Sequence, residues 1–444
     1  MNAAKLVPSF RLLLLAGAVI VPAALIAVLP GWQELGYLLI GAAGLAAIAD
    51  AFLAPRRVRH ISVQTGPLVR MWKDRTTVID LIIRNEAQQE IALRIGLLFP
   101  PEIVPPQEEQ RTVLPAAAEF SRIQWECTPL KRGQYFITQC VVERPSALGL
   151  WDVRKTLPLQ LEIRVYPNLA AERKKSPAFF KRGRLGMNVQ RQLGKGREFE
   201  KLREYASGDS FEDVDWKATA RRGHPITRVF QVERTQEIYI VLDASRLTAR
   251  PVPNDPNATI LERNVTASLL LALAAEKQGD LFGLITFSDR VHKFVRARNG
   301  KAHYSACRDA LYMLHARAVT PDFEELFSLL RLRLRRRALL IFLTELDDPI
   351  VAETFVRNLK LLRQHLLLVG MTRPAGAQPL FEDSQVDAVD DVYKKLAGHI
   401  SWNKLRELGK VLASQGVRFS LLDADTLGPE LATIYLDLKQ RQLL

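Results

Sequence analysis

The chain has 444 residues, of which 48% are hydrophobic and 25% are charged, and its formal net charge is +14. This length is enough for two or three domains, and the composition excludes a chain that lacks a folded core. The cysteines Cys127, Cys140 and Cys307 show no paired spacing, which argues against a zinc site or a disulfide framework and fits a reducing compartment.

The N-terminal region, residues 1–57, contains two apolar runs. Residues 10–29 and 35–54 each approach the roughly 20 residues that a helix needs to cross a bilayer. A short turn that contains Trp32 joins them, so we predict a transmembrane helical hairpin. A cleaved signal peptide is the rival interpretation of the first run, but a second apolar run directly afterwards argues against it.

Basic residues flank the two apolar runs on their outer sides. Lys5 and Arg11 lie near the start of the first run, and Arg56, Arg57 and Arg59 follow the second. Because short positively charged segments remain in the cytoplasm, both ends of the hairpin are expected there. We therefore predict a multi-pass protein of the cytoplasmic membrane whose remaining residues face the cytosol.

The next region, residues 58–168, shows strand patterns without a long helical period. Within residues 77–84, Ile79, Leu81 and Ile83 share one face of a strand, while Asp80 and Arg84 lie on the other. Further β-rich runs precede Pro145 and Pro167. A small antiparallel β-sandwich-like domain is the simplest interpretation.

A basic linker and a densely charged segment occupy residues 169–234. Residues 171–203 include eleven Lys or Arg and three Glu. A basic segment can bind nucleic acid, or it can be attracted to the anionic leaflet beneath a membrane-anchored domain. We expect contact with membrane lipid and no nucleic-acid partner.

The C-terminal region, residues 235–444, alternates short apolar strands with helical segments. The strand-like runs are "EIYIVLDAS", "LFGLITFS", "ALLIFLTEL", "HLLLVGMT" and "VRFSLLDAD", and the clearest helix covers residues 257–278. Continuous apolar strands between helices predict an α/β fold with an open parallel sheet that is covered on both faces. Ligands bind such sheets beyond the carboxyl ends of the strands.

Oxygen-bearing side chains follow these strand ends. Asp243 ends the first strand, Ser245 lies two residues on, and Thr344 and Glu345 end a later strand, while Thr320 precedes a helix. Because Mg²⁺ prefers oxygen ligands, one prediction is a metal site made of Asp243, Ser245, Thr320 and Glu345. The alternative is that Asp243 and Thr320 cap the helices that follow them.

The stretch "LREYASGDSFEDVDWKATARRGHP", residues 202–225, has signals for one helix over residues 211–222. Ser210 and Asp213 are similar to a capping box, and Gly223 can end the helix in the left-handed conformation. Trp216 is expected to be buried. The many charges make either an ion-pair network that joins the linker to the sheet or a partner-binding surface. Residues predicted for that surface are Glu204, Tyr205, Asp209, Asp215, Trp216, Lys217 and Arg221.

The segment from residue 196 to residue 245 resembles the signature of the domain of unknown function 58 family. The resemblance rests on "GREF", "LREY", "GDS", "DWKATARR" and a strand that ends in Asp243, and "TPLKRGQY" and "PSALGLWDV" extend it over essentially the whole chain. It implies a sheet similar to a von Willebrand factor type A domain. It also implies a bacterial inner-membrane protein that acts with an AAA-type ATPase of the MoxR kind in assembling or activating other proteins.

The type A resemblance further implies a Mg²⁺ site of the form Asp-x-Ser-x-Ser with a later Thr and Asp, completed by a carboxylate of a partner. Asp243 and Ser245 match the first two positions, and Thr320 matches the later Thr. Leu247 stands where the second Ser is usual, and Glu345 stands where Asp is usual. One hydroxyl fewer and a longer carboxylate are expected to weaken the site.

Three functional hypotheses follow, one of which is a structural envelope protein whose basic arm, residues 173–203, holds the rest of the chain against lipid. The leading one is a non-enzymatic, membrane-anchored protein-interaction module, because the sequence contains no His-Glu-x-x-His, Walker A or Gly-x-Ser-x-Gly motif. The alternative is a metal-dependent hydrolase in which Asp243 and Glu345 hold a cation that activates water. The oligomeric state is left open by the sequence.

Overall fold

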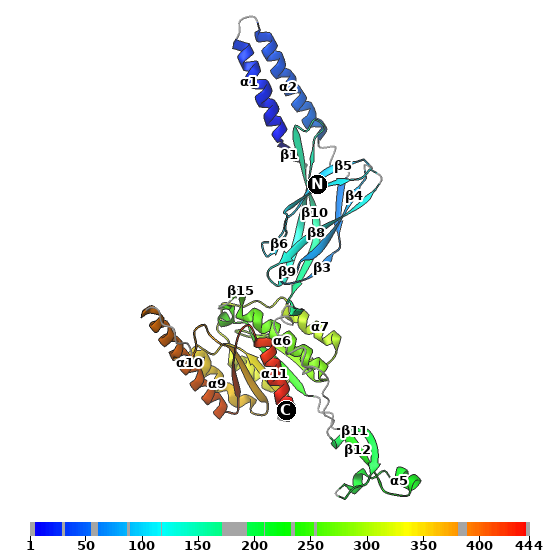
Figure 1. Cartoon of the computed structure of the whole chain (residues 1–444), viewed down its shortest axis with the longest axis vertical. Helices are drawn as coiled ribbons and strands as arrows, with labels where there is room; N and C mark the ends of the chain where they lie inside the picture. Colours follow the sequence, from blue (N-terminus) through cyan, green and yellow to red (C-terminus); the bar gives the residue numbers. More distant parts are fainter. Residues whose placement is uncertain are drawn as a thin grey trace. The chain divides into compact units, whose positions relative to one another are not determined.

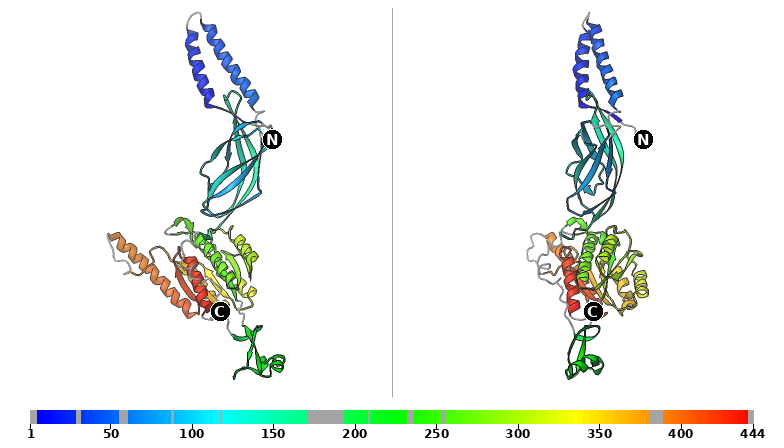
Figure 2. Two further views of the ribbon diagram at one scale, coloured as in Figure 1. Left: turned by 45° about the vertical axis from the view of Figure 1, so that its right-hand side comes forward. Right: turned by 90° about the vertical axis from the view of Figure 1, so that its right-hand side faces the viewer.

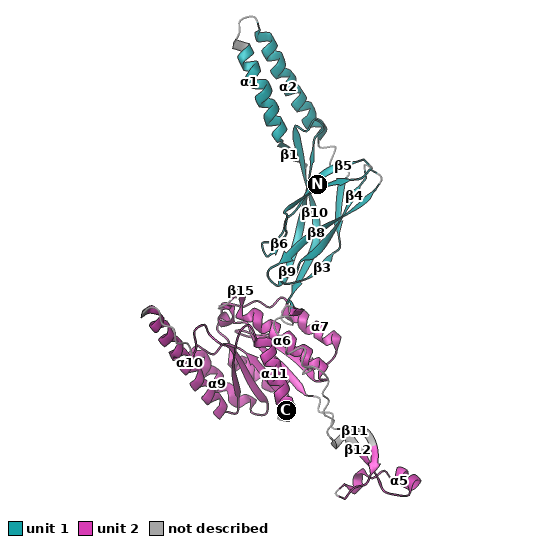
Figure 3. Cartoon of the chain, in the orientation of Figure 1, with its two compact units in different colours: residues 1–168 teal, residues 169–444 magenta. Residues whose placement is uncertain are grey.

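The computed structural model describes residues 5–28, 32–54, 61–86, 89–116, 118–170, 193–207, 209–231, 236–252, 255–380 and 389–440. The predicted linker therefore lies largely outside the described residues. The chain forms two compact units, residues 1–168 and 169–444, which are coloured separately in Figure 3. As predicted, the protein has a mixed α/β structure.

The first unit contains two apolar helices, α1 (Phe10–Val28) and α2 (Gln33–Leu53). They lie side by side in Figures 1 and 2. Among the described helices, α2 has the length and apolar composition needed to cross a membrane, and α1 is a shorter apolar helix. Large side chains on both helices are exposed, including Leu13 and Leu45, and apolar surface of this kind marks a contact with a membrane or a protein.

Two β-sheets complete the first unit. The smaller sheet contains, in spatial order, β2 (Ile61–Thr65), β4 (Thr77–Asn85), β8 (Phe120–Pro129) and β6 (Ile103–Val104). The larger sheet contains, in spatial order, β1 (Lys5–Pro8), β10 (Trp151–Tyr166), β9 (Gly133–Pro145), β5 (Ile91–Leu97) and β7 (Glu109–Leu114). A further strand, β3 (Leu68–Trp72), pairs in parallel with β10, whereas the other described pairs in this unit are antiparallel.

The inward-facing side chains of the two sheets form one apolar core. Ile79, Leu81 and Ile83 of β4 are fully buried, so the predicted alternation matches the observed burial. Trp125 of β8 is also fully buried, and its indole N–H donates to the carbonyl of Gln107 (3.2 Å). A buried Trp requires such an acceptor for its only donor.

Hydrogen bonds connect α2 to the larger sheet. Asp50, in the last turn of α2, is buried and accepts hydrogen bonds from the Ser146 hydroxyl (2.5 Å) and from the amides of Leu148 (3.1 Å) and Leu150 (3.3 Å). These donors lie in the loop that joins β9 to β10. A buried carboxylate needs such donors, so the loop and the end of α2 stabilise each other.

The second unit is built on a six-stranded sheet. Its strands, in spatial order, are β17 (Val291–Arg298), β16 (Leu281–Phe287), β13 (Glu237–Asp243), β18 (Leu339–Leu343), β19 (Leu366–Thr372) and β20 (Arg418–Leu422). Pairs among the last five strands are parallel, and β17 pairs antiparallel with β16. The sheet is therefore mixed rather than purely parallel. The sequence prediction missed β17 because this edge strand is half-exposed and has no continuous apolar run.

Helices cover both faces of this sheet (Figure 1). One face packs against α6 (Ile260–Lys277), α7 (Lys301–Leu311) and α11 (Leu427–Gln440), and the other against α8 (Phe323–Arg333), α9 (Pro349–Asn358) and α10 (Val389–Ser414). In β13, Ile238 and Ile240 enter the first core, whereas Tyr239 and Val241 enter the second. The strand is apolar throughout because both of its faces are covered.

The helix predicted over residues 257–278 is α6, which begins at Ile260. Thr259 is its N-cap, and the Thr259 hydroxyl accepts a hydrogen bond from the amide of Glu262 (3.3 Å). The residues just before it form β14 (Pro251–Val252) and β15 (Asp255–Thr259). Cap geometry rather than apolar periodicity therefore sets the start of this helix.

A buried carboxylate attaches the C-terminal helix to the sheet. Asp280, directly before β16, accepts hydrogen bonds from Lys439 Nζ (2.7 Å), from the Tyr435 hydroxyl and from the amide of Gln236 (3.3 Å). Lys439 and Tyr435 both belong to α11. The contact therefore fixes α11 against the amino-terminal ends of β13 and β16.

We predict that Asp280→Ala lowers the free energy of unfolding of a fragment of residues 169–444 by about 3 kcal/mol, because it leaves Lys439 and Tyr435 without their buried partner. Urea denaturation measures this loss. The control is Glu353→Ala, which removes an exposed partner of Arg357 (2.8 Å) and is expected to cost less than about 0.5 kcal/mol. Equal losses in the two variants would contradict the prediction.

Candidate metal site and charged surface

The first candidate site lies at the carboxyl end of β13. Asp243 is fully buried, and one of its carboxylate oxygens accepts a hydrogen bond from the amide of Ser245 (2.8 Å). The other oxygen accepts a hydrogen bond from the hydroxyl of Thr344 (2.7 Å). Because Thr344 directly follows β18, this bond joins the ends of two neighbouring parallel strands.

The environment of Asp243 favours a bound proton or cation. Burial raises the pKa of Asp243, and the hydrogen bonds from Thr344 and Ser245 act in the opposite direction. Within the described part of the chain, no basic side chain forms an ion pair with this carboxylate. A fully buried carboxylate in this situation is stabilised either by protonation or by a positive ion.

A hydroxyl beside Asp243 is available as a further ligand. Ser245 is fully buried, and its Oγ has no hydrogen-bond partner among the residues that the structure describes. Leaving such a group unsatisfied costs about 1–3 kcal/mol, and coordination to a cation would supply a partner. Asp243 and Ser245 therefore fit an oxygen-ligand site for Mg²⁺ that water molecules would complete.

The structure separates Glu345 from this pair. Glu345 is buried, but its carboxylate accepts a hydrogen bond from the amide of Thr372, at the end of β19 (3.2 Å). The preceding residue, Thr344, contacts Asp243 at the end of β13 instead. These two adjacent residues therefore contact the two strands that flank β18, β13 on one side and β19 on the other.

Thr320 is exposed and precedes α8. The prediction that Thr320 caps this helix is wrong, because Asp322 is the N-cap and accepts hydrogen bonds from the amides of Glu324 (2.9 Å) and Glu325 (3.0 Å). The segment before it does approach the β13 end, since the amide of Arg246 donates to the carbonyl of Val319 (2.9 Å). The predicted metal ligands do not include Thr344, although its hydroxyl contacts Asp243. The position of Thr344 directly after a strand is the feature of the sequence that could have indicated this contact.

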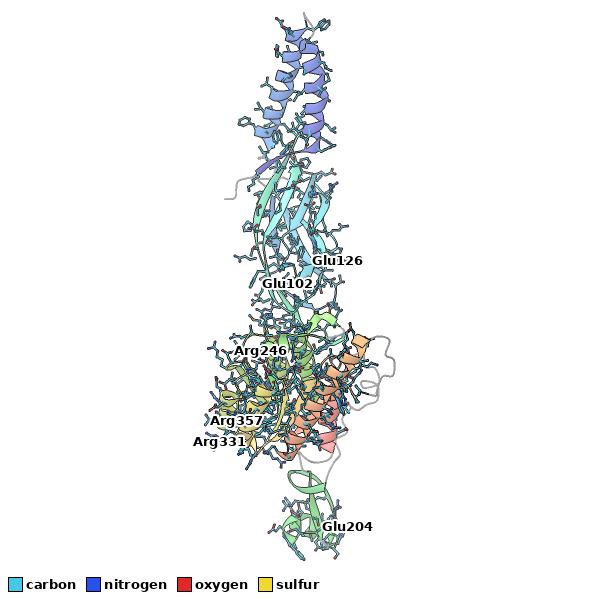
Figure 4. All side chains as sticks on the ribbon, turned by 90° about the vertical axis from the view of Figure 1, so that its left-hand side faces the viewer. Glu102, Glu126, Glu204, Arg246, Arg331 and Arg357 are labelled. Carbon is cyan, nitrogen blue, oxygen red and sulfur yellow. The ribbon has the colours of Figure 1, made fainter. Side chains whose placement is uncertain are left out.

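Ion pairs surround the end of β13. Arg250 makes two hydrogen bonds to Asp347 (2.6 and 2.8 Å), and Arg246, labelled in Figure 4, lies 3.1 Å from Asp348. Both Arg residues belong to the segment that contains the short helix η3 (Arg246–Ala249), and both Asp residues precede α9. The pairs therefore fix the loop after β13 against the loop after β18. In the described ranges, no group of three or more His, Cys, Asp or Glu residues could hold a metal.

We predict that the fragment of residues 169–444 binds Mg²⁺ or Mn²⁺ through Asp243. Asp243→Asn should abolish the calorimetric signal, and Ser245→Ala should weaken binding roughly tenfold or more, because Mg²⁺ tolerates ligand loss poorly. Glu345→Gln is the matched control, since its carboxylate contacts Thr372, and it should bind as the parent does. Loss of binding in Glu345→Gln alone would contradict this assignment.

Glu345 also predicts a pH dependence of stability. Burial is the main factor that raises its pKa to about 8, against the opposing effects of the Thr372 amide and Arg250. Between the ordinary pKa of Glu and about pH 8, Glu345 keeps its proton in the folded protein but loses it in the unfolded chain. The contribution of Glu345 to the free energy of unfolding is therefore complete below the ordinary pKa and decreases as the pH rises towards 8. In chelator, Glu345→Gln should show a weaker fall between pH 5 and pH 9 in urea denaturation. Parallel pH profiles would contradict the prediction.

The second candidate site, termed here the charged module, comprises residues 202–228. Its framework is the antiparallel pair β11 (Leu193–Glu204) and β12 (Ile226–Gln231). Asp209 accepts hydrogen bonds from the amide of Ala206 (3.0 Å), from Arg203 (2.6 Å) and from the Thr227 hydroxyl (3.4 Å), and the first two contacts lower its pKa most. Asp209 therefore stabilises the module from within.

The single helix predicted over residues 211–222 is wrong. The structure has a 3-10 turn, η2 (Phe211–Asp213), and a separate helix, α5 (Trp216–Arg222). Val214 is buried, is extended and bridges to Thr227, which interrupts the helix. Asp215 is the N-cap of α5 and accepts a hydrogen bond from the amide of Ala218 (2.9 Å). The predicted end is correct, since Gly223 adopts the left-handed conformation (φ 74°).

Two aromatic side chains project from the charged module. Trp216 is 68% exposed, which corrects its predicted burial, and Phe211 is 72% exposed. The centroid of the Phe211 ring lies 5.7 Å from the centroid of the ring of Tyr205, which is half-buried. The structure thus adds Phe211 to the predicted surface. The remaining predicted residues divide into exposed Glu204 (labelled in Figure 4), Lys217 and Arg221 and half-buried Asp209 and Asp215.

The ion pairs of the charged module are internal. Arg203 pairs with Asp209 (2.6 Å), and His224 lies 3.4 Å from Glu204. Arg228 approaches Asp215 at 4.0 Å. These contacts hold the two strands, the turn and α5 together, so they explain part of the charge density without the predicted connection to the sheet.

Fold and site together define an α/β protein with an aspartate–hydroxyl cluster at a strand end and a separate charged module. Residues 201–375 match the family model described as Protein of unknown function DUF58, so the predicted resemblance to that family is confirmed. No curated protein sequence matches this chain.

Two solved structures are similar to parts of the chain. Proximal thread matrix protein 1 from the mussel byssus has 14% identity and a TM-score of 0.26, and the match covers 46% of this chain and 46% of that protein. The chain thus matches about half the length of the mussel protein. The SpRpn10 VWA domain has 10% identity and a TM-score of 0.26, with coverage of 44% of this chain and 93% of that domain.

Proposed function

We propose that this protein is a membrane-anchored protein-interaction module that acts with an AAA-type ATPase of the MoxR kind in assembling or activating other proteins. The observation that carries the proposal is the exposed pair Phe211 and Trp216 on the charged module. Large aromatic side chains often dominate the energy of protein interfaces. The contacts of Asp209 hold the backbone around this pair in place, so the surface is preorganised.

Membrane anchoring is supported by the apolar helices of the first unit. We propose that α1 and α2 both cross the cytoplasmic membrane as a hairpin and that the rest of the chain faces the cytosol. The length and composition of α2 support one span, and the exposed side chains Leu13 and Leu45 would contact lipid. The basic residues Lys5 and Arg11 near the start of α1 support the orientation.

The Asp243 site supports a role in recognition rather than in hydrolysis. A cation held by Asp243 and Ser245 would keep open positions for a carboxylate of the partner. The alternative, a metal-dependent hydrolase, requires Asp243 and Glu345 to hold one cation that activates water. The contacts direct those two carboxylates to different strands, so this alternative has less structural support.

The proposal is tested by binding of the fragment of residues 169–444 to the MoxR-type ATPase of the same organism. We expect Trp216→Ala to weaken the Kd about 30-fold, which is typical of a dominant interface residue. Tyr393→Ala, which removes an aromatic side chain of the same 68% exposure from α10, is the matched control and should leave the Kd unchanged.

Calorimetry or surface plasmon resonance can measure both affinities, with and without Mg²⁺. No binding of the parent fragment would contradict the ATPase partnership. Binding that both variants retain would contradict the assignment of the charged module as the interface.

A further inference from the structure

The loop at residues 146–151 is attached to both apolar helices. From α2, Asp50 accepts three hydrogen bonds from this loop. Directly before α1, the hydroxyl of Ser9 donates to the carbonyl of Gly149 (2.6 Å), and the amide of Ser9 donates to the carbonyl of Leu150 (3.0 Å). The loop therefore belongs to the same rigid assembly as the helix ends.

Trp151 extends this contact along α2. Its indole N–H donates to the carbonyl of Ala47 (2.8 Å). Ala47 precedes Leu53, the last residue of α2, by six residues, which is about 9 Å along the helix axis. The contacts of the loop thus extend over almost two helical turns from the end of the helix.

The length of α2 determines the depth of this contact. Its 21 residues span about 31 Å at 1.5 Å per residue, and the hydrocarbon core of a bilayer is about 30 Å thick. A spanning α2 has no spare turns outside the core. The end of α2 must therefore lie at the boundary between hydrocarbon and headgroups, with its last two turns and the loop beside them within about 11 Å of that boundary.

The side chains at this level suit that boundary. Leu148, in the loop, is 58% exposed, while Phe10 at the start of α1 and Phe52 near the end of α2 are 74% and 80% exposed. The half-buried Trp151 has an apolar ring and one polar N–H, a combination that is enriched at membrane interfaces. Exposed apolar side chains and an interfacial Trp are thus gathered where the helices end.

The polar groups of the loop are compatible with this depth because the protein satisfies them. An ionisable residue inside a membrane is costly unless it has partners, and the loop supplies three donors to Asp50. Arg11 lies against Gly149, where a Cβ atom would come within 2.9 Å of its guanidinium, and Gly149 has a φ of +70°. The left-handed backbone conformation at position 149 is strained for residues other than Gly, so Gly149 fixes the shape of this loop.

We propose that the loop at residues 146–151 inserts into the membrane interface, with Leu148 in contact with phospholipid. The β-sandwich would then be part of the membrane anchor, because the loop joins its strands β9 and β10. This inference rests on the proposed membrane anchoring through α2. It adds a lipid-contacting surface that the apolar helices alone do not require.

Site-directed fluorescence quenching of the full chain tests the inference. Leu148→Cys, Phe136→Cys and Leu45→Cys variants are labelled with a fluorescent maleimide and reconstituted in vesicles of phosphatidylcholine and phosphatidylglycerol. The vesicles carry nitroxide lipids labelled either at the headgroup or in the middle of the acyl chain. The native Cys127, Cys140 and Cys307 are buried, and burial raises their pKa to about 11, 12 and 12, so they should react slowly at pH 7.

The three positions form a matched set. Phe136 lies on β9 and has the same 58% exposure as Leu148, but it precedes Ser146 by ten residues, about 30 Å along a strand. Leu45, in the middle of α2, is 70% exposed. We expect headgroup nitroxides to reduce the emission of the Leu148→Cys label but not that of the Phe136→Cys label, and mid-chain nitroxides to reduce the emission of the Leu45→Cys label.

The outcomes separate the two proposals. Quenching of the Leu45→Cys label without quenching of the Leu148→Cys label would show that α2 is inserted and that the loop is outside the interface, which overturns this inference alone. An unquenched Leu45→Cys label would overturn membrane anchoring as well. Ala147→Cys, at a second exposed loop position, provides the same measurement if Leu148→Cys does not reconstitute.

Discussion

The structure depends on the requirement that a buried carboxylate has partners. Asp280 meets it with Lys439 and Tyr435, and that contact attaches α11 to the sheet. Asp50 meets it with a hydroxyl and two amides of one loop, which attaches α2 to the β-sandwich. Among the described residues, Asp243 accepts hydrogen bonds from Thr344 and from a local amide but forms no ion pair, and the adjacent Ser245 hydroxyl has no hydrogen-bond partner there. The same requirement therefore produces two structural joints and one site that can accept a cation.

Local patterns in the sequence were sufficient for much of the fold. The apolar strand runs and the apolar spacing in α6 follow from burial, because the residues of these segments are apolar wherever they face the core. The edge strand β17 was missed because it is half-exposed and has no continuous apolar run, and the interruption of the helix before Trp216 was missed for another reason. The break at Val214 depends on its bridge to Thr227, a contact that only the folded hairpin creates, and short-range capping signals could not reveal it.

For the candidate sites as well, the sequence predicts contacts between residues close in the chain but not those that depend on the folded structure. Asp243 and Ser245 are two residues apart after one strand, so their proximity followed from the sequence. Thr344 and Glu345 are adjacent in the chain, but Thr344 contacts Asp243 at the end of β13 and Glu345 contacts Thr372 at the end of β19. Sequence alone could not decide which of them faces Asp243. The exposure of Trp216 could not be predicted either, because the charged module is too small to bury both Phe211 and Trp216.

The strand β10 links the proposed membrane contact to the rest of the first unit. It extends from Trp151 to Tyr166, with a register shift in its pairing with β9 between Pro158 and Leu161. It pairs with β1 at one end and with β3 at the other, and it ends two residues before the unit boundary at Asn168. Its 16 residues span about 50 Å. Because both ends are paired and Trp151 is bonded to α2, the first unit can act as a stiff spacer. If the loop at residues 146–151 lies at the lipid interface, the chain leaves this unit up to about 50 Å from the membrane, a distance that the sandwich rather than a flexible linker would set.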